Sequence, residues 1–245
     1  MKWLSVRISG NVMWPKKKTT VSFAGHDLVL YPPTPDTDPS LHISLNKLSA
    51  KQGMTLINRF LSFLAWCDDA AVENLGGISG HLNPRPIPRQ EGNQLWYTDM
   101  FPPSVKLYED ERALRALALF REARSVNSIP FCLLSYFKIL NIVWNDKKIK
   151  GKNEIVEGIR DTLPRILDSE AKDRIERLRQ KGERDIAAYL YESGRCAVAH
   201  AYKDPIADPD DIEDLHKLSE DTWIIKAIAE YLIENNLMIS HTFLD

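Results

Sequence analysis

Arg195 and His200 are the two residues whose types and spacing best suit catalysis, because they join a fixed cation to a proton acceptor in one short segment. The segment Gly194–His200 reads Gly-Arg-Cys-Ala-Val-Ala-His. A neutral imidazole can take a proton from a hydroxyl group near neutral pH. A guanidinium can bind two phosphate oxygens through parallel hydrogen bonds. Together the two residues predict cleavage of a phosphodiester, as in RNA, without a metal ion.

The spacing of Arg195 and His200 limits how one helix could present them. In a regular α-helix, five residues turn through roughly 500°, which leaves the two side chains about 140° apart and about 7.5 Å apart along the axis. A second copy of the helix, related by two-fold symmetry, would bring two arginines and two histidines around one groove. The alternative is a surface arginine and a histidine that the helix dipole favours near a helix C-terminus.

A basic loop at Lys147–Lys152 is a further candidate, here for contacts with phosphate groups. Its alternative explanation is a solvated surface run. The lysines that we expect to contact RNA are Lys147, Lys148 and Lys150.

The composition is that of a globular protein, with 44% hydrophobic and 27% charged residues and a formal net charge of −2. No global basic field indicates a nucleic-acid partner, so any such contact must use local patches. The three cysteines lack ligand spacing, which disfavours a zinc site and suits a reducing compartment. The longest apolar run, Ile129–Trp144, is interrupted by polar residues and too short to span a bilayer. We therefore expect a cytoplasmic protein without membrane contact, metal or cofactor.

Two patterns of secondary structure divide the chain. Residues 1–48 contain short β-branched and aromatic runs between turn residues, which predict strands, and apolar spacing predicts a helix over residues 52–67. Residues 76–103 are rich in Gly and Pro and predict either a long functional loop or a few edge strands. Beyond residue 106 the pattern is helical. The predicted helices span residues 109–126, 129–144, 154–180 with a break at Pro164, 183–201 and 211–236.

The fold class that follows is α+β. A small N-terminal mixed α/β module over residues 1–105 would precede an antiparallel α-helical bundle over residues 106–245.

The C-terminal half resembles a HEPN domain, the nucleotide-binding helical bundle of higher eukaryotes and prokaryotes. The resemblance covers residues 107–238 and rests on the order of the helices and on Arg195 and His200, which match the family's Arg-and-His motif on a late helix. The segments Arg195–Asp211 and Arg59–Trp66 are also similar to MauJ-like methylamine-utilization proteins.

The HEPN resemblance implies a homodimer whose late helices face each other and a metal-independent endoribonuclease acting in phage defence, a toxin system or RNA processing. His200 would act as general base on the ribose 2′-hydroxyl or order the reacting groups, and Arg195 would hold the scissile phosphate and stabilise its developing charge. Tyr202 and Lys203 would make further RNA contacts. One residue departs from the family pattern: Cys196 follows the arginine where members often carry Asn, Asp or His, and a thiol is only a weak donor and acceptor.

Two other functions stay open. The neutral-to-acidic bundle and Cys196 also suit a non-catalytic binding or scaffold protein, such as an accessory factor of a defence complex or an amine-utilization operon, with a partner encoded nearby. In the third alternative, the N-terminal module binds a ligand or partner through residues 76–103 and senses a trigger for the bundle.

Overall fold

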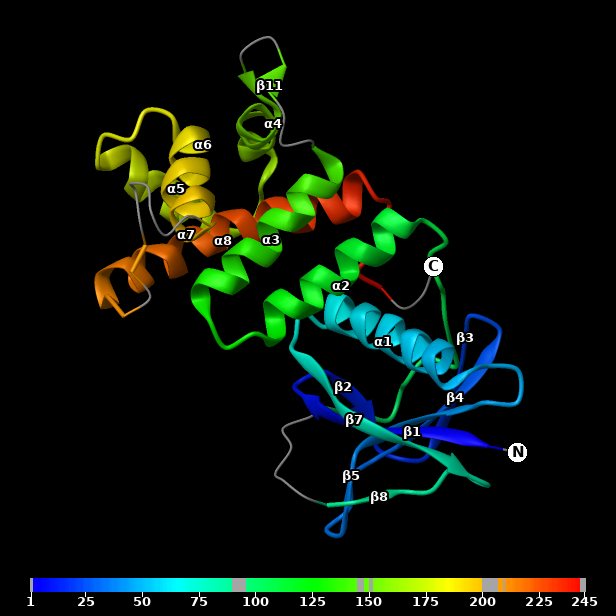
Figure 1. Ribbon diagram of the computed structural model, residues 1–245. Helices are drawn as coiled ribbons and strands as arrows, with labels where there is room; N and C mark the ends of the chain where they lie inside the picture. Colours follow the sequence, from blue (N-terminus) through cyan, green and yellow to red (C-terminus); the bar gives the residue numbers. More distant parts are fainter. Residues whose placement is uncertain are drawn as a thin grey trace. The chain divides into compact units, whose positions relative to one another are not determined.

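The computed structural model describes residues 2–89, 96–144, 148–149, 152–199, 207–208 and 210–242. It consists of two compact units. Unit 1 comprises Met1–Ser125 together with Ser240–Asp245, and unit 2 comprises Val126–Ile239. The described strands of the extended sheet lie in unit 1, whereas unit 2 is mainly helical (Figure 1). The predicted α+β class is therefore confirmed.

Unit 1 is built on a mixed sheet whose described strands follow the order β10-β3-β4-β6-β1-β7. Neighbouring strands are antiparallel, except that β10 runs parallel to β3. The strands are β1 (Trp3–Gly10), β3 (Thr19–Phe23), β4 (His26–Tyr31), β6 (Ser40–Ser44), β7 (Val72–His81) and β10 (Ser104–Val105). Two short pairs are β2 (Met13–Pro15) with β9 (Trp96–Thr98), and β5 (Thr37–Asp38) with β8 (Ile87–Pro88).

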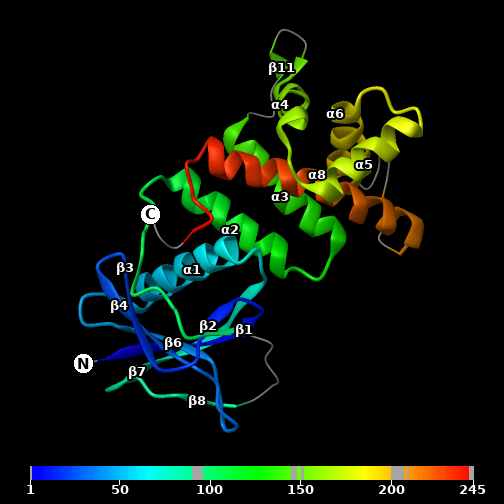
Figure 2. The ribbon, with the colours of Figure 1, turned by 180° about the vertical axis from the view of Figure 1, so that it is seen from behind.

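Helix α1 (Ala50–Cys67) covers one face of this sheet, and both views show it between the sheet and helix α2 (Figures 1 and 2). Ser49 and Gln52 form a capping box that fixes its start. Gly53 permits the close approach, because a Cβ there would lie 3.0 Å from Leu45 and 3.3 Å from Ile43. Phe60 then packs edge-on against Phe23 of β3, with ring centroids 5.5 Å apart. The helix predicted over residues 52–67 is confirmed.

Helix α2 (Glu111–Ser125) packs on α1, and Phe120 meets Trp66 edge-on at 5.1 Å. Trp66 also holds the returning C-terminal segment, because its Nε1 donates to the carbonyl oxygen of Ser240 at 2.9 Å and its ring stacks on His241 at 3.6 Å. By packing, α2 therefore belongs to unit 1. The predicted division into an α+β module over residues 1–105 and a helical bundle over residues 106–245 stays a prediction.

Strand β7 forms an edge of the sheet across the segment for which the sequence left a loop or edge strands open. Gly77 lies tightly against β1, since a Cβ there would be 2.9 Å from the carbonyl oxygen of Ser5. Gly76 has a φ of +99°, in the left-handed region that favours glycine. The first described residues of the Gly- and Pro-rich segment 76–103 therefore belong to an edge strand.

Unit 2 has α3 and α8 packed side by side at its centre (Figures 1 and 2). Its described helices are α3 (Ile129–Val143), α4 (Glu154–Thr162), α5 (Ser169–Gln180), α6 (Ile186–Tyr189), α7 (Ala197–Ala199) and α8 (Ile212–Asn235). A short hairpin, β11 (Lys148–Ile149) with β12 (Lys152–Asn153), precedes α4. The predicted break at Pro164 is confirmed, because a 3₁₀ turn at Leu163–Arg165 separates α4 from α5.

A fully buried histidine, His42, links β1 and β6 in unit 1. Its Nδ1 lies 2.7 Å from the hydroxyl of Ser5, the residue opposite it in the register, and its Nε2 lies 2.9 Å from the hydroxyl of Ser40. Burial lowers the pKa of His42 from 6.5 to about 4, with smaller contributions from the charges of Lys18 and His81. The folded protein thus holds the imidazole neutral.

We predict that acid destabilises unit 1 through His42. The contribution of the neutral His42 side chain to the stability of unit 1 is complete above pH 6.5. It is lost as the pH falls from 6.5 through about 4, because between these two values the histidine is protonated in the unfolded chain and not in the folded protein. The loss amounts to about 3 kcal/mol. Urea denaturation of wild type and His42→Gln across this pH range checks it. The variant should lose this part of the pH dependence, and the half-buried control His26→Gln should keep it; equal pH profiles for all three proteins contradict the prediction.

Candidate functional site

Arg195 lies in a π-helical segment, Leu190–Cys196, that joins α6 to α7. The amide of Ala197 donates to the carbonyl oxygen of Glu192, five residues earlier, which is the hydrogen bond that defines this helix type. From Ile186 to Ala199 the described backbone is continuously helical, as predicted. Arg195 lies one residue before the end of the π-helical segment, and Ala197–Ala199 follow as α-helix. Turns of this type are rare and frequently occur at functional sites.

The guanidinium of Arg195 is half-buried and has an aromatic and a thiol neighbour. Its central carbon lies 5.5 Å from the ring centroid of Tyr191, within the range of a cation–π contact. Its Nη1 lies 3.9 Å from the sulfur of Cys196, a weak acceptor. Gly194 is buried beside it and allows the turn to approach Leu133 and Phe137 of α3. The turn that carries Arg195 is thereby packed on the centre of unit 2.

The remaining residues predicted for the site fall outside the part of the chain that the structure describes. They are His200, Tyr202, Lys203, Lys147 and Lys150. For Lys148 the structure gives the backbone, paired with Asn153 in the β11–β12 hairpin, and not the side chain. The pairing of Arg195 with His200 therefore stays a prediction.

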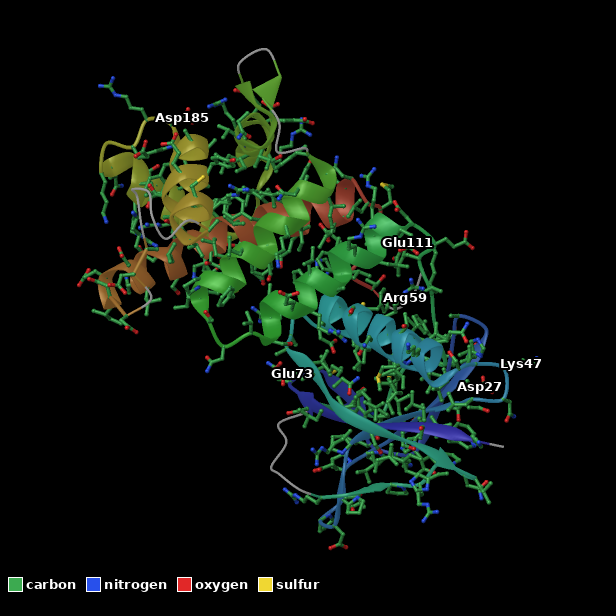
Figure 3. All side chains as sticks on the ribbon, in the orientation of Figure 1. Asp27, Lys47, Arg59, Glu73, Glu111 and Asp185 are labelled. Atoms are coloured by element: carbon green, nitrogen blue, oxygen red, sulfur yellow. The ribbon has the colours of Figure 1, made fainter. Side chains whose placement is uncertain are left out.

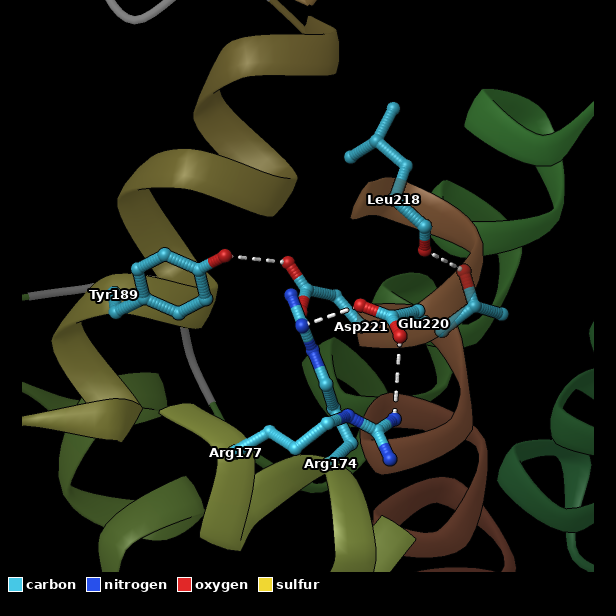
Figure 4. A network of polar contacts seen from close by, with 7 residues as sticks. Arg174, Arg177, Tyr189, Leu218, Glu220 and Asp221 are labelled. Atoms are coloured by element: carbon cyan, nitrogen blue, oxygen red, sulfur yellow. Dashed lines mark hydrogen bonds and ion pairs between the residues drawn. The ribbon is translucent and has the colours of Figure 1, made fainter. Parts of the chain in front are cut away.

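A buried ionic cluster holds the end of α6, the helix that leads to Arg195, and Figure 4 shows this cluster. Arg174 of α5 is 2% exposed and donates from Nε to Asp221 of α8, which is fully buried, at 2.8 Å. A second guanidinium nitrogen pairs with Glu220. The hydroxyl of Tyr189, the last residue of α6, donates to the other carboxylate oxygen of Asp221 at 2.9 Å. Helices α5, α6 and α8 are thus joined around one buried charge.

The protonation states of this cluster suit a structural role. Burial opposes the charge of Arg174, but Asp221 and Glu220 outweigh that effect and raise the pKa of the guanidinium. Burial and then the negative charge of Asp221 raise the pKa of Tyr189, so the phenol keeps the proton that it donates. A phenol held in this way is a poor base and a poor nucleophile at neutral pH. The cluster positions α6 and has no evident chemistry of its own.

A second polar contact holds the N-terminus of α6. The Asp185 carboxylate, labelled in Figure 3, caps the helix by accepting from the amide of Ala188 at 3.2 Å, and it pairs with Arg160 of α4 at 2.7 Å. An open polar cavity of about 500 Å³ lies beside the cluster. Lys217 on its wall places its ammonium 5.4 Å from the ring centroid of Tyr189. Its walls carry both signs of charge, so they select no ligand class.

The sequence analysis did not single out the charged residues of this cluster. The signal was present: Arg174 lies at helical spacing among Ala171, Ile175 and Leu178, all buried. Asp221 lies in the same way among Leu218, Ile224 and Ile225. A charge at an apolar position of a helix predicts a buried partner, since an isolated buried charge is very costly.

Other chemistries find little support among the described residues. No group of three or more His, Cys, Asp or Glu side chains in that part could hold a metal ion. Ser5 and His42 resemble a nucleophile with its base, but His42 is fully buried and has no access to a substrate. Of the helices described, none is long and apolar enough to cross a membrane.

Comparison with known proteins identifies one family. Residues 116–234 match the model of the family described as Methylamine utilization protein MauJ. The matched part contains Arg195, Arg174 and Asp221, so this stretch of the chain is MauJ-like, whereas Arg59–Trp66 lies outside the match. No curated protein and no solved structure matches the chain.

We predict that Asp221→Ala destabilises unit 2 by about 3 kcal/mol, because it leaves Arg174 buried without its fully buried counter-charge. Tyr189→Phe removes one hydrogen-bond donor to a charged group and should cost about 1.5–3 kcal/mol. Asp173→Ala, on the exposed side of α5, is the matched control and should change stability by less than about 0.5 kcal/mol. Chemical denaturation measures all three. The role assigned to the cluster is wrong if Asp221→Ala costs no more than the control.

Proposed function

We propose that the chain is a metal-independent endoribonuclease of the HEPN class that acts as a homodimer, with Arg195 and His200 at its active site. The observation that carries the proposal is the setting of Arg195. Arg195 is half-buried on a π-helical turn and lies beside the ring of Tyr191. In the sequence, His200 follows directly after Ala199, the last described residue of this helix.

The proposed reaction needs only a base and an anion clamp. The His200 imidazole takes the proton from the ribose 2′-hydroxyl, whose oxygen attacks the adjacent phosphorus. The bond from phosphorus to the 5′-oxygen of the next nucleotide breaks, and that oxygen gains a proton. The products are a 2′,3′-cyclic phosphate and a 5′-hydroxyl. Arg195 binds the phosphate oxygens and stabilises the negative charge that develops on them.

The placement of Arg195 supports such a role. The face of the Tyr191 ring lies within cation–π range of the guanidinium. The packing of Gly194 on α3 and the capping of α6 hold the backbone of the turn, and a catalytic group benefits from such fixed placement.

In the proposed homodimer, two copies of this helix line one groove, so that arginines and histidines of both copies face one RNA strand. Tyr202, Lys203 and the loop lysines Lys147, Lys148 and Lys150 are the proposed additional contacts to phosphates. Phage defence or a toxin system is the proposed setting. Sedimentation of the full chain tests the dimer.

We predict that the purified full chain cleaves single-stranded RNA in the presence of EDTA and leaves 2′,3′-cyclic phosphate ends. His200→Ala and Arg195→Ala should each lower the cleavage rate by about 10²- to 10⁴-fold, because each removes a group that acts in the transition state. The controls are His26→Ala and the exposed Arg115→Ala, which should cleave like wild type. Undiminished cleavage by His200→Ala, or loss of all cleavage in EDTA, would overturn the proposal.

A non-catalytic accessory protein is the second candidate, and the match to the family described as Methylamine utilization protein MauJ is compatible with it. In this role the helical unit binds a protein partner encoded nearby and Arg195 and His200 have no catalytic function. Affinity purification of the full chain from its own host tests it. A stable complex that survives His200→Ala, without RNA turnover, supports this candidate; the absence of any such complex contradicts it.

A further inference from the structure

A cavity of about 680 Å³ lies entirely within unit 1, where α1, α2 and the start of β7 meet. This volume is in the range of sites for small ligands. Its polar wall comes from Asn58 of α1, Asn74 of β7 and Arg121 of α2. None of these residues takes part in the site of unit 2.

Arg121 differs from the nearby Arg59 and Arg124 in the group to which it binds. Arg59 pairs with Glu111 at 3.5 Å, a contact whose residues Figure 3 labels, and Arg124 pairs with Asp69 at 3.3 Å. Arg121 instead donates from Nη1 to the backbone carbonyl oxygen of Asn58 at 3.1 Å, and it has no ion pair with a carboxylate among the described residues. Burial lowers the pKa of this guanidinium, and the neighbouring charge of Glu122 only partly opposes that effect. A half-buried cation thus faces a cavity with most of its donors still available.

The side-chain amides of Asn74 and Asn58, beside Arg121, are hydrogen-bonded to each other. The amide of Gly76 donates to Oδ1 of Asn74 at 2.9 Å, which fixes the orientation of that side chain. Its Nδ2 then donates to Oδ1 of Asn58 at 3.2 Å and points at the sulfur of Met54 at 3.0 Å. The two amides therefore form a rigid wall and leave the guanidinium for a ligand.

The carboxylates at the same cavity restrict the charge of that ligand. Glu73, exposed at the start of β7, and Glu122 both line it (Figure 3 labels Glu73). With Arg121 they give the cavity a net negative formal charge, so a multiply charged anion such as phosphate would be repelled. A ligand with one carboxylate and one ammonium group fits both signs. A guanidinium recognises a planar carboxylate through two parallel hydrogen bonds.

We propose that this cavity binds a zwitterion of the amino acid class, with its carboxylate on Arg121 and its ammonium group on the side of Glu73. The apolar part of the ligand would lie against Met54, Val72 and Ala118, which complete the wall. The binding site is confined to unit 1, so it stands whether or not unit 2 cleaves RNA.

The test is isothermal titration of the full chain with each of the twenty amino acids, and then with the matching des-amino acid and decarboxylated amine of the best binder. We expect one or a few amino acids to bind and both truncated analogues to bind at least about tenfold more weakly. Arg121→Gln should weaken the amino acid by at least about tenfold, and Glu73→Gln should weaken it to a smaller extent. Arg115→Gln, on the exposed side of the same helix, should bind like wild type.

Two results would overturn the proposal. One is a full chain that binds none of the amino acids. The other is a des-amino acid or inorganic phosphate that binds as tightly as the amino acid, which means that the site selects an anion only. Because Glu73 is exposed, Glu73→Gln keeps the proposal testable even if Arg121→Gln fails to fold. An unchanged affinity of Glu73→Gln for the amino acid would contradict the proposed contact between Glu73 and the ammonium group.

Discussion

The charge of Arg174 is the constraint on which unit 2 depends. A guanidinium placed among the apolar residues of α5 is tolerable only where carboxylates neutralise it, and Asp221 and Glu220 of α8 provide them. Because Tyr189 donates to the same carboxylate, the end of α6 is tied to this pair as well. The π-helical segment begins at the next residue, so the placement of Arg195 follows from a salt bridge made by other helices.

Unit 1 is organised differently, by apolar contact across a sheet. One group of its buried polar residues, His42 with Ser5 and Ser40, is uncharged, and the buried Asp38 pairs with Arg7 at 3.8 Å. Arg121 stands out against that background, since it is a half-buried charge with a carbonyl oxygen as its hydrogen-bond partner. In unit 2 a buried cation has protein counter-charges and fixes structure. In unit 1 the half-buried Arg121 has no ion pair with a carboxylate in the part of the chain that the structure describes, and we therefore assign Arg174 to structure and propose Arg121 for binding.

Much of the fold could be predicted because it depends on local pattern. The period of Ile57, Phe60 and Leu64 predicts α1, and Pro164 predicts the break after α4. Features that depend on distant partners escaped: the buried charge of Arg174, the packing of α2 on α1, and the path of β7, whose exposed glycines show no alternation. The π-helical turn at Arg195 also escaped, because no spacing of residues distinguishes it from regular helix. Arg195 itself could be selected from the sequence. Arg121 could not, because its proposed role in binding depends on which groups surround it in the folded unit.

The path of the chain connects the two candidate sites. Helix α2, which carries Arg121, ends at Ser125, and α3 of unit 2 begins at Ile129, so only a short segment separates them. The other end of unit 2 returns to unit 1 at Ser240, where Trp66 of α1 holds it. One link of unit 2 therefore continues from α2, and the segment that follows the other link is held by a side chain of α1.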